Sequence, residues 1–403
     1  MKNLKMYCTN CKREYPIQHV HPRCMLCNEP LEVQSVSQGK IKEGNPLTQT
    51  ILERYSDFFP FNDINNDLSL NEGFTSLVSS KKLASKIGIK NIYFKNESEN
   101  PTWSFKDRGT LLGIQHAYSL GYKKVGAVST GNMAVSVAAY GKRAGFETFI
   151  LVSKTIPEEK LNPVAIYGAN LIKVDGDYGN LYYESLKIGE KQGIYFINSD
   201  VTYRVEGSKT IAFEICEQLK YDVPEYVIVP TSAGGNIRGI LKGFEEFKQV
   251  GIINKIPKMI CAQAAGCSPI YNAFIKNTDT VKRVIEHETI AHGIENPFPP
   301  SGNQVLRKLR KNGGICISVT DEEIINAQKE LAQEGIFGQP ESAVPLASIK
   351  KLKKQGFLKE TDSVACVVTG SGLKYTKVFE KHNLKAYECN IEKLNFFIRN
   401  NFK

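Results

Sequence analysis

Short apolar runs alternate with helical patterns along most of the chain from Leu77 onward. The runs are rich in β-branched residues and bounded by turn residues, which is typical of buried strands. Strands that alternate with helices favour parallel sheets covered on both faces, so the pattern predicts a doubly wound α/β fold. The predicted strands are 92–95, 124–128, 148–152, 170–174, 194–198, 226–229, 258–263, 314–319 and 363–368, and the predicted helices are 105–120, 133–144, 158–167, 181–191, 206–219, 237–249, 321–333 and 341–354.

The composition is that of an ordinary globular protein. The chain has 403 residues, 41% of them hydrophobic and 23% charged, which allows two or three domains. No apolar run reaches the roughly 18 residues of a membrane span, and the first residues lack the apolar core of a signal peptide. The net charge is +10, but acidic residues are interleaved with the lysines, which favours a solvated basic surface over a nucleic-acid site. We therefore expect a cytoplasmic protein that binds neither membranes nor nucleic acids.

Four cysteines near the N-terminus form two Cys-x-x-Cys pairs, Cys8 with Cys11 and Cys24 with Cys27, and 12 residues separate the pairs. Each pair offers two thiolates to one tetrahedral ion, so the four complete a structural Zn²⁺ site. A redox dithiol would need only one pair. We predict a zinc ribbon over residues 1–32, with a hairpin between the pairs, followed by a linker over 33–70 that contains one helical stretch.

Lys106 stands at a predicted helix start. Ser104 and Asp107 have the spacing of a capping box, which places the first helical residue at about Phe105. The helix dipole disfavours an ammonium group there, and burial beside Phe105 and Trp103 acts in the same direction. A neutral lysine amine is a nucleophile. The alternative is a solvated surface lysine, which is the commonest place for this residue.

Two glycine-rich turns follow predicted strands, at residues 129–134 and 230–236. Each precedes a predicted helix, whose first backbone N–H groups point toward an anion. Neither turn has the Gly-x-Gly-x-x-Gly spacing or the lysine of a Walker loop, which disfavours a dinucleotide or a nucleoside triphosphate. The pattern predicts a phosphate-bearing ligand of another kind at the carboxyl ends of the strands.

The segment Ser104-Phe105-Lys106-Asp107-Arg108-Gly109 resembles the cofactor-lysine segment of the fold type II pyridoxal 5'-phosphate (PLP) enzymes, and most closely that of threonine synthases. Other segments between Leu70 and Lys374 resemble the same family. The resemblance implies that Lys106 is catalytic and carries PLP. It implies cofactor contacts for Phe105, Lys106, Asn132, Ser232, Ala233, Gly234, Gly235, Asn236 and Thr369. It implies substrate contacts for Ser129, Thr130, Gly131, Asn198, Ser199 and Arg204.

The resemblance also implies a domain plan and an activity. A large PLP-binding domain would span 71–107 and 205–403, and a small mobile substrate domain would span 108–204, as in the tryptophan synthase β-like fold. The family is often dimeric, so we expect a homodimer. The implied reaction converts O-phospho-L-homoserine and water to L-threonine and phosphate, with the Lys106 amine moving protons at the substrate carbons.

Three residues depart from the family pattern, and they keep other functions open. Trp103 replaces a glycine, Met133 replaces a threonine, and Gln339 stands where the family segment Glu-Pro-Ala-Ser-Ala has its glutamate. One alternative is a related PLP enzyme of β/γ-replacement or elimination, such as a phosphoserine-using synthase or a threonine/serine dehydratase. A second is a homologue that binds PLP without turnover. A third, from another class, is a non-catalytic zinc-ribbon protein that binds nucleic acid.

Overall fold

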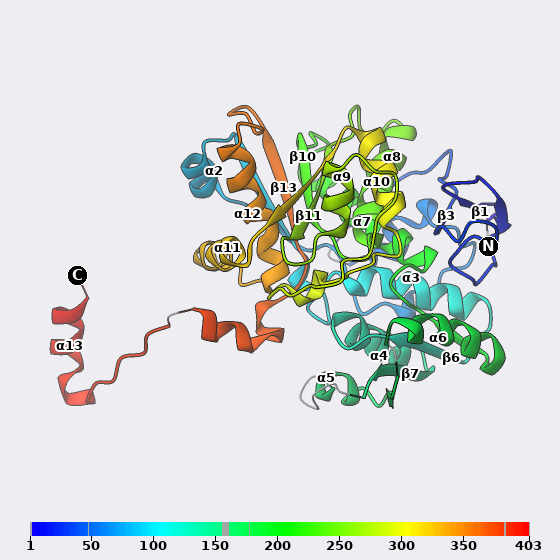
Figure 1. The fold of residues 1–403 in the computed structure, drawn as a ribbon, viewed down its shortest axis with the longest axis horizontal. Helices are drawn as coiled ribbons and strands as arrows, with labels where there is room; N and C mark the ends of the chain where they lie inside the picture. The colour runs from blue at the N-terminus through cyan, green and yellow to red at the C-terminus, as the bar shows by residue number, and fades with distance from the viewer. Residues whose placement is uncertain (1, 47, 155–160, 177, 383, 403) are drawn as a thin grey trace.

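The computed structural model describes residues 2–46, 48–154, 161–176, 178–382 and 384–402 (Figure 1). Within them the chain forms three sheets, whose strand orders are β2-β1-β3, β12-β11-β10-β13-β5-β4 and β8-β7-β6-β9. The two larger sheets are parallel except for the β4–β5 pair. Strand–helix alternation therefore produced the predicted α/β fold with parallel sheets.

The six-stranded sheet is buried on both faces. Along β10 (Tyr226–Pro230), Val227 and Val229 belong to one hydrophobic cluster and Ile228 belongs to another, because successive side chains point to opposite faces. The other strands are β4 (Leu77–Ser79), β5 (Asn91–Asn96), β11 (Lys258–Ala264), β12 (Ile315–Val319) and β13 (Ser363–Val368). Helices α2 (Lys81–Ile87), α11 (Asp321–Gln333) and α12 (Pro340–Lys354) cover one face. Helices α7 (Thr202–Gln218), α8 (Gly235–Gln249), α9 (Pro269–Ile275) and α10 (Gly302–Asn312) lie on the other.

The four-stranded sheet contains β6 (Lys124–Val128), β7 (Glu147–Ser153), β8 (Asn170–Val174) and β9 (Ile194–Phe196). Its accompanying helices are α3 (Lys106–Ser119), α4 (Asn132–Arg143), α5 (Asn162–Ala165) and α6 (Tyr178–Gln192). Every strand pair in this sheet is parallel. The domain limits at 107/108 and 204/205, and the mobility of the smaller domain, stay predictions.

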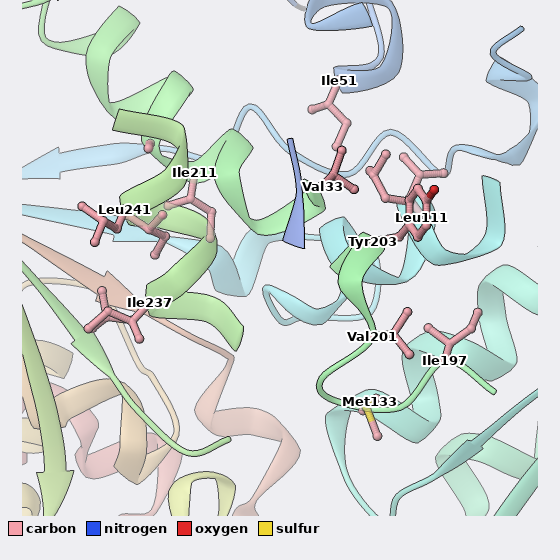
Figure 2. Packing of buried hydrophobic residues seen from close by; sticks show 14 of the residues in the cluster. Val33, Ile51, Leu111, Met133, Ile197, Val201, Tyr203, Ile211, Ile237 and Leu241 are labelled. Carbon is pink, nitrogen blue, oxygen red and sulfur yellow. The ribbon is translucent and has the colours of Figure 1, made fainter. Parts of the chain in front are cut away.

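The N-terminal sheet consists of β1 (Lys5–Cys8), β2 (Glu14–Pro16) and β3 (Leu31–Val33), with β1 in the centre. The predicted hairpin between the cysteine pairs is wrong, because β2 pairs with β1 and the second neighbour of β1 comes from beyond Cys27. This sheet shares the main hydrophobic core. Val33 of β3 belongs to the same cluster as Tyr203 of α7 and Leu111 of α3, and Figure 2 shows these side chains together with Ile51.

The segment 33–70 is packed against the body through buried aromatic side chains, Tyr55, Phe58, Phe59 and Phe61. The single helical stretch predicted there is a short α1 (Ile51–Arg54) followed by a 3-10 turn. The sequence patterns missed α2, α9 and α10. The predicted helix 158–167 falls partly outside the described residues, and its described part is α5.

After the body the chain forms a C-terminal arm that ends in α13 (Leu394–Asn401) and stands apart from the rest (Figure 1). Phe396 is 72% exposed on this arm. Among the helices that the structure describes, none is both long enough and apolar enough to cross a membrane.

Candidate active site

A cavity of about 320 Å³ lies where the turns after β6, β10 and β13 meet the start of α3. Parallel strands bring their carboxyl ends to one edge, which is where such sheets bind ligands. The structure brings nearly all predicted site residues together here. Those lining the cavity are Phe105, Lys106, Ser129, Thr130, Gly131, Asn132, Ser199, Arg204, Ser232, Ala233, Gly234, Gly235, Asn236 and Thr369.

The Lys106 amine is set for nucleophilic chemistry. Its Nζ lies 4.3 Å from the ring centroid of Phe105. Burial, together with the nearby Arg204 guanidinium, lowers the pKa of Lys106 to about 7, while Glu341 acts in the opposite direction. The amine is therefore substantially neutral at physiological pH. Trp103, which we expected to help bury Lys106, is not among the residues that line this cavity and is 53% exposed.

The capping box predicted from Ser104 and Asp107 is wrong. The helix begins at Lys106, and its N-cap residue Phe105 makes no side-chain cap bond. The Asp107 carboxylate instead accepts hydrogen bonds from the backbone N–H and the hydroxyl of Thr102, at 2.7 and 2.5 Å. Ser104 forms a backbone bridge with Gly370, and its buried hydroxyl has no hydrogen-bond partner among the described residues, so it does not cap the helix. The Asp107–Thr102 hydrogen bonds thus hold the turn before Lys106 and do not cap the start of the helix.

The apoprotein is expected to capture PLP at a rate that rises with pH through about 7 and then levels off. The reactive species is the neutral amine, and a lowered pKa produces it at lower pH. With a lysine of ordinary pKa, the capture rate would keep rising up to about pH 10.5. The measurement is the absorbance of bound cofactor against time from about pH 5 to pH 10.

Pyridoxal is the matched control for this experiment, because it lacks the phosphate group, which itself titrates near pH 6. If the capture rates of PLP and of pyridoxal rise with the same pH midpoint, the titrating group belongs to the protein. A capture rate still climbing above about pH 9 would show that Lys106 has an ordinary pKa.

The turn between β10 and α8 fits the phosphate of PLP. Gly234 has φ +96°, and a Cβ there would lie 2.7 Å from Val305 Cγ2. A Cβ on Gly235 would lie 3.1 Å from the Ser199 carbonyl oxygen. Both atoms of the buried Asn236 side-chain amide have no hydrogen-bond partner among the described residues. Backbone N–H groups at a helix start and an unsatisfied amide form an anion cradle that side chains larger than hydrogen would fill.

Polar side chains from other elements surround the space beside Lys106. The Asn132 amide, at the start of α4, donates to Gln339 Oε1 at 2.7 Å. The Thr369 hydroxyl, just after β13, lies 3.2 Å from that of Ser342. Since Thr369 is neutral, it does not force a proton onto a ring nitrogen facing it. These groups suit the ring of PLP.

Arg204 is a buried cation without a carboxylate partner among the described residues. It is 6% exposed, and its nearest hydrogen-bond partners are the Thr110 hydroxyl at 3.0 Å and the Lys106 carbonyl at 3.4 Å. Burial lowers its pKa to about 10, so it stays protonated at neutral pH. The Asp107 carboxylate acts in the opposite direction, so the buried charge is partly compensated, and an anionic ligand would relieve the remaining cost.

Asn198 is the one predicted site residue that the structure places outside the cavity lining. Its amide is already used, because Oδ1 accepts from the Val128 N–H at 2.9 Å and Nδ2 donates to the Ser185 hydroxyl at 3.0 Å. The side chain holds the loop after β9 against β6. Its neighbour Ser199 does line the cavity.

Glu341 lines the cavity and was missed by sequence reasoning. Burial raises its pKa, while His292 and Lys106 act in the opposite direction. Gly293 passes so close that a Cβ there would lie 2.1 Å from Glu341 Oε1. The available signal was the resemblance itself: Glu341 stands at the alanine of Glu-Pro-Ala-Ser-Ala, two residues after Gln339. The carboxylate of this segment has therefore moved along the helix start.

A wider cavity of about 690 Å³ adjoins the first and shares Thr130, Gly131, Asn132 and Glu341 with it. Trp103 lines this outer cavity, with φ +62°. Glycine adopts positive φ without strain, which explains the residue that the family commonly has there. The ring narrows the approach to the site.

A lysine at a helix start, facing a glycine-rich anion cradle among parallel strands, defines a PLP-dependent enzyme of fold type II. The profile of the family described as "Pyridoxal-phosphate dependent enzyme" matches residues 68–370. Threonine synthases from Methanocaldococcus jannaschii and Methanosarcina acetivorans are 39% and 36% identical to this chain over 377 and 375 residues. These alignments cover 91% of this chain in both cases, and 92% and 91% of the relatives. The chain belongs to the PLP-dependent enzymes and, within them, to the threonine synthases.

Solved structures support the same fold. Maize serine racemase superimposes with a TM-score of 0.66 at 24% identity, covering 76% of this chain and 91% of that one. Threonine deaminase isoform 2 from Solanum lycopersicum superimposes with a TM-score of 0.63 at 24% identity, covering 77% of this chain and 88% of that one. At this identity the comparison shows the fold alone.

Proposed function

We propose that this enzyme converts O-phospho-L-homoserine and water to L-threonine and phosphate. The observation that carries the proposal is the buried, unpaired guanidinium of Arg204 in the cavity that holds the Lys106 amine. A substrate phosphate would satisfy it with charge-assisted hydrogen bonds. The name and the extent of similarity of the curated relatives support the same reaction.

When bound, PLP supplies an electron sink that stabilises negative charge on the substrate α carbon. The backbone N–H groups from Ser232 to Asn236 would hold its phosphate, and Asn132 and Thr369 would orient its ring. The Lys106 amine, whose pKa of about 7 lets it both accept and donate a proton near neutral pH, takes and returns protons at the α and β carbons of the substrate. Arg204 and Ser199 hold the phosphate that leaves from the γ carbon. The turn of Ser129, Thr130 and Gly131 binds the carboxylate.

The functional test is turnover of the purified holoenzyme on O-phosphohomoserine, O-phosphoserine, threonine and serine in parallel, with phosphate, threonine and keto acids quantified. Threonine and phosphate from O-phosphohomoserine alone would support the proposal. Keto acid or phosphate from another substrate, without threonine, would move the function to a phosphoserine-using synthase or a threonine/serine dehydratase. Bound PLP without turnover would indicate an inactive homologue.

Zinc belongs to the proposal as a structural ion. The sulfur atoms of Cys8, Cys11, Cys24 and Cys27 all lie within 4.8 Å of one another. The Sγ atoms of Cys8 and Cys27 are 3.4 Å apart, and those of Cys11 and Cys24 are 3.5 Å apart. A tetrahedral ion with metal–sulfur bonds of about 2.3 Å needs thiolates about 3.8 Å apart, so the cluster fits Zn²⁺.

Replacing Cys24 by serine is expected to remove the zinc, because a fourth thiolate is needed to close the site. Elemental analysis should give about one zinc per chain in the parent and a small fraction of that in the variant. The variant should also unfold at lower temperature. Cys389→Ser, at an exposed thiol on the C-terminal arm, is the control and should retain the zinc. Undiminished zinc in Cys24→Ser would refute the assigned ligand set.

We further propose that the enzyme acts in the cytoplasm as a homodimer. All ten cysteines are free thiols, which suits a reducing compartment. The dimer rests on the resemblance to the family. Light scattering at the mass of one 45.0 kDa chain would contradict it.

A further inference from the structure

The N-terminal ribbon is seated directly on the loop that carries the proposed phosphate site. Arg23 immediately precedes the ligand Cys24, and its Nη1 donates to Asp200 Oδ2 at 2.9 Å and to the Pro300 carbonyl at 3.1 Å. The Arg23 side chain is 9% exposed and that of Asp200 is fully buried. Buried ion pairs tolerate little displacement, because separating them leaves an uncompensated charge.

Asp200 is held from a second direction. The hydroxyl of Tyr182, on α6, lies 2.7 and 2.8 Å from the two carboxylate oxygens. The Asp200 carboxylate thus connects its own loop to the ribbon through Arg23 and to α6, a helix that packs on the four-stranded sheet, through Tyr182. Because both sides are fixed, the loop backbone at Asp200 is fixed as well.

The loop presents alternate faces to the ribbon and the cavity. Ser199 and Arg204 line the cavity, whereas Asp200, Thr202 and Tyr203, which lie between them in the chain, bond the ribbon. The Thr202 hydroxyl donates to the Leu31 carbonyl at 3.5 Å, and the Tyr203 hydroxyl donates to the Ile17 carbonyl at 2.6 Å. Figure 2 shows Val201 and Tyr203 along this stretch, and Val33, at the end of β3, belongs to the same hydrophobic cluster.

We propose that Arg23 is a positioning residue for the substrate-phosphate site: through Asp200 it holds the segment 199–204, a short loop and the first turn of α7, so that Ser199 and Arg204 face the cavity together. The inference rests on the proposed function of Arg204 and deepens it. It gives the ribbon a part in substrate binding beyond stabilising the fold. The effect is on binding and geometry, because Arg23 itself touches no reacting atom.

The test compares Arg23→Ala with the parent holoenzyme. KM for O-phosphohomoserine should rise about tenfold or more, with a smaller change in kcat, since misplacing a binding group by a fraction of an ångström weakens the contact it makes. The dissociation constant of inorganic phosphate, measured by calorimetry on the holoenzyme, should rise by a similar factor. Arg23→Lys keeps the charge and should recover most of the loss.

Asp200→Asn removes the other half of the pair and should act in the same direction. The double variant should be no worse than the more severe single variant, because both changes remove one interaction. Asp200→Asn also keeps the test decisive if Arg23→Ala does not fold. Additive losses in the double variant would overturn the inference.

Arg307→Ala is the matched control. Arg307 pairs with Glu29 at 2.6 Å and docks the ribbon on α10, outside the cavity lining. Phosphate affinity should be unchanged in this variant. Equal losses in Arg307→Ala and Arg23→Ala would mean that only general docking of the ribbon matters, which would overturn the positioning role.

The phosphate titration separates this inference from the proposed function. A parent enzyme that binds phosphate but does not turn over O-phosphohomoserine would refute the reaction and leave the positioning role testable by the same titrations. A parent holoenzyme that binds no inorganic phosphate would overturn the inference whatever its substrate.

Discussion

Lys106→Ala is expected to lower turnover about a thousandfold or more while the fold is retained. The substitution removes the amine that carries the cofactor and moves protons, and no other lysine lines the inner cavity in the described part of the chain. The absorbance of covalently held PLP should disappear with the activity. Turnover on O-phosphohomoserine and the visible spectrum are the two measurements.

The stability of the same variant supplies an independent check. Burial lowers the pKa of Lys106 from 10.5 to about 7, so the unfolded chain binds more protons than the folded chain between these values. Desolvating this ammonium opposes folding at neutral pH, and the opposition fades as pH rises through that window. Lys106→Ala should therefore leave the apoprotein at least as stable as the parent at pH 7 by thermal unfolding.

Lys187→Ala is a suitable control, because Lys187 is exposed on α6 and pairs with Glu184 at the surface. It should change neither spectrum nor turnover. Partial rescue of Lys106→Ala by small amines would confirm that the missing function is proton transfer. Normal activity in Lys106→Ala would refute the assignment of the cofactor lysine.

Local patterns identified the parts of the site that depend on local structure. A glycine-rich turn between a parallel strand and a helix predicts an anion site, and the family resemblance singled out Gly234, which lies in the cavity lining. Strand–helix alternation likewise determined the fold. The elements missed inside the body are short or strongly basic, as with α10, whose polar composition hides its buried stripe of Val305, Leu306 and Leu309.

Predictions that depended on tertiary partners did less well. The family resemblance implied that Asn198 contacts the substrate. Its side-chain amide instead forms hydrogen bonds with Val128 and Ser185 from other elements. The Asp107 carboxylate bonds Thr102 instead of capping its helix. The Arg23–Asp200 pair is visible only once distant segments are brought together, since no local spacing relates the two residues.

Replacing Arg204 by methionine is expected to reduce kcat/KM for O-phosphohomoserine about a hundredfold, equivalent to about 3 kcal/mol. Most of the loss should appear in KM, because the guanidinium holds the phosphate in substrate and transition state alike. The dissociation constant for inorganic phosphate should rise in parallel. Steady-state kinetics and calorimetry measure the two effects.

The same substitution should stabilise the apoprotein. Arg204 is buried and stays charged below its pKa of about 10, and its hydrogen-bond partners within the described ranges are the neutral Thr110 hydroxyl and Lys106 carbonyl, with Asp107 acting on its pKa without an ion pair among the described residues. Methionine of similar length removes that unpaired charge and keeps apolar contacts. Loss of activity with a raised unfolding temperature is the signature of a residue kept for ligand binding at the expense of stability.

Arg108→Met is the matched control, because Arg108 is also a fully buried arginine but is paired with Glu97 at 2.6 Å and with Glu214. Removing it leaves two buried carboxylates, of which Glu214 also pairs with Lys95, and should destabilise the fold by about 3–5 kcal/mol. The two variants should therefore shift the unfolding temperature in opposite directions. Destabilisation by both would mean that Arg204 holds the structure together like Arg108, and the phosphate site would have to be sought elsewhere in the cavity.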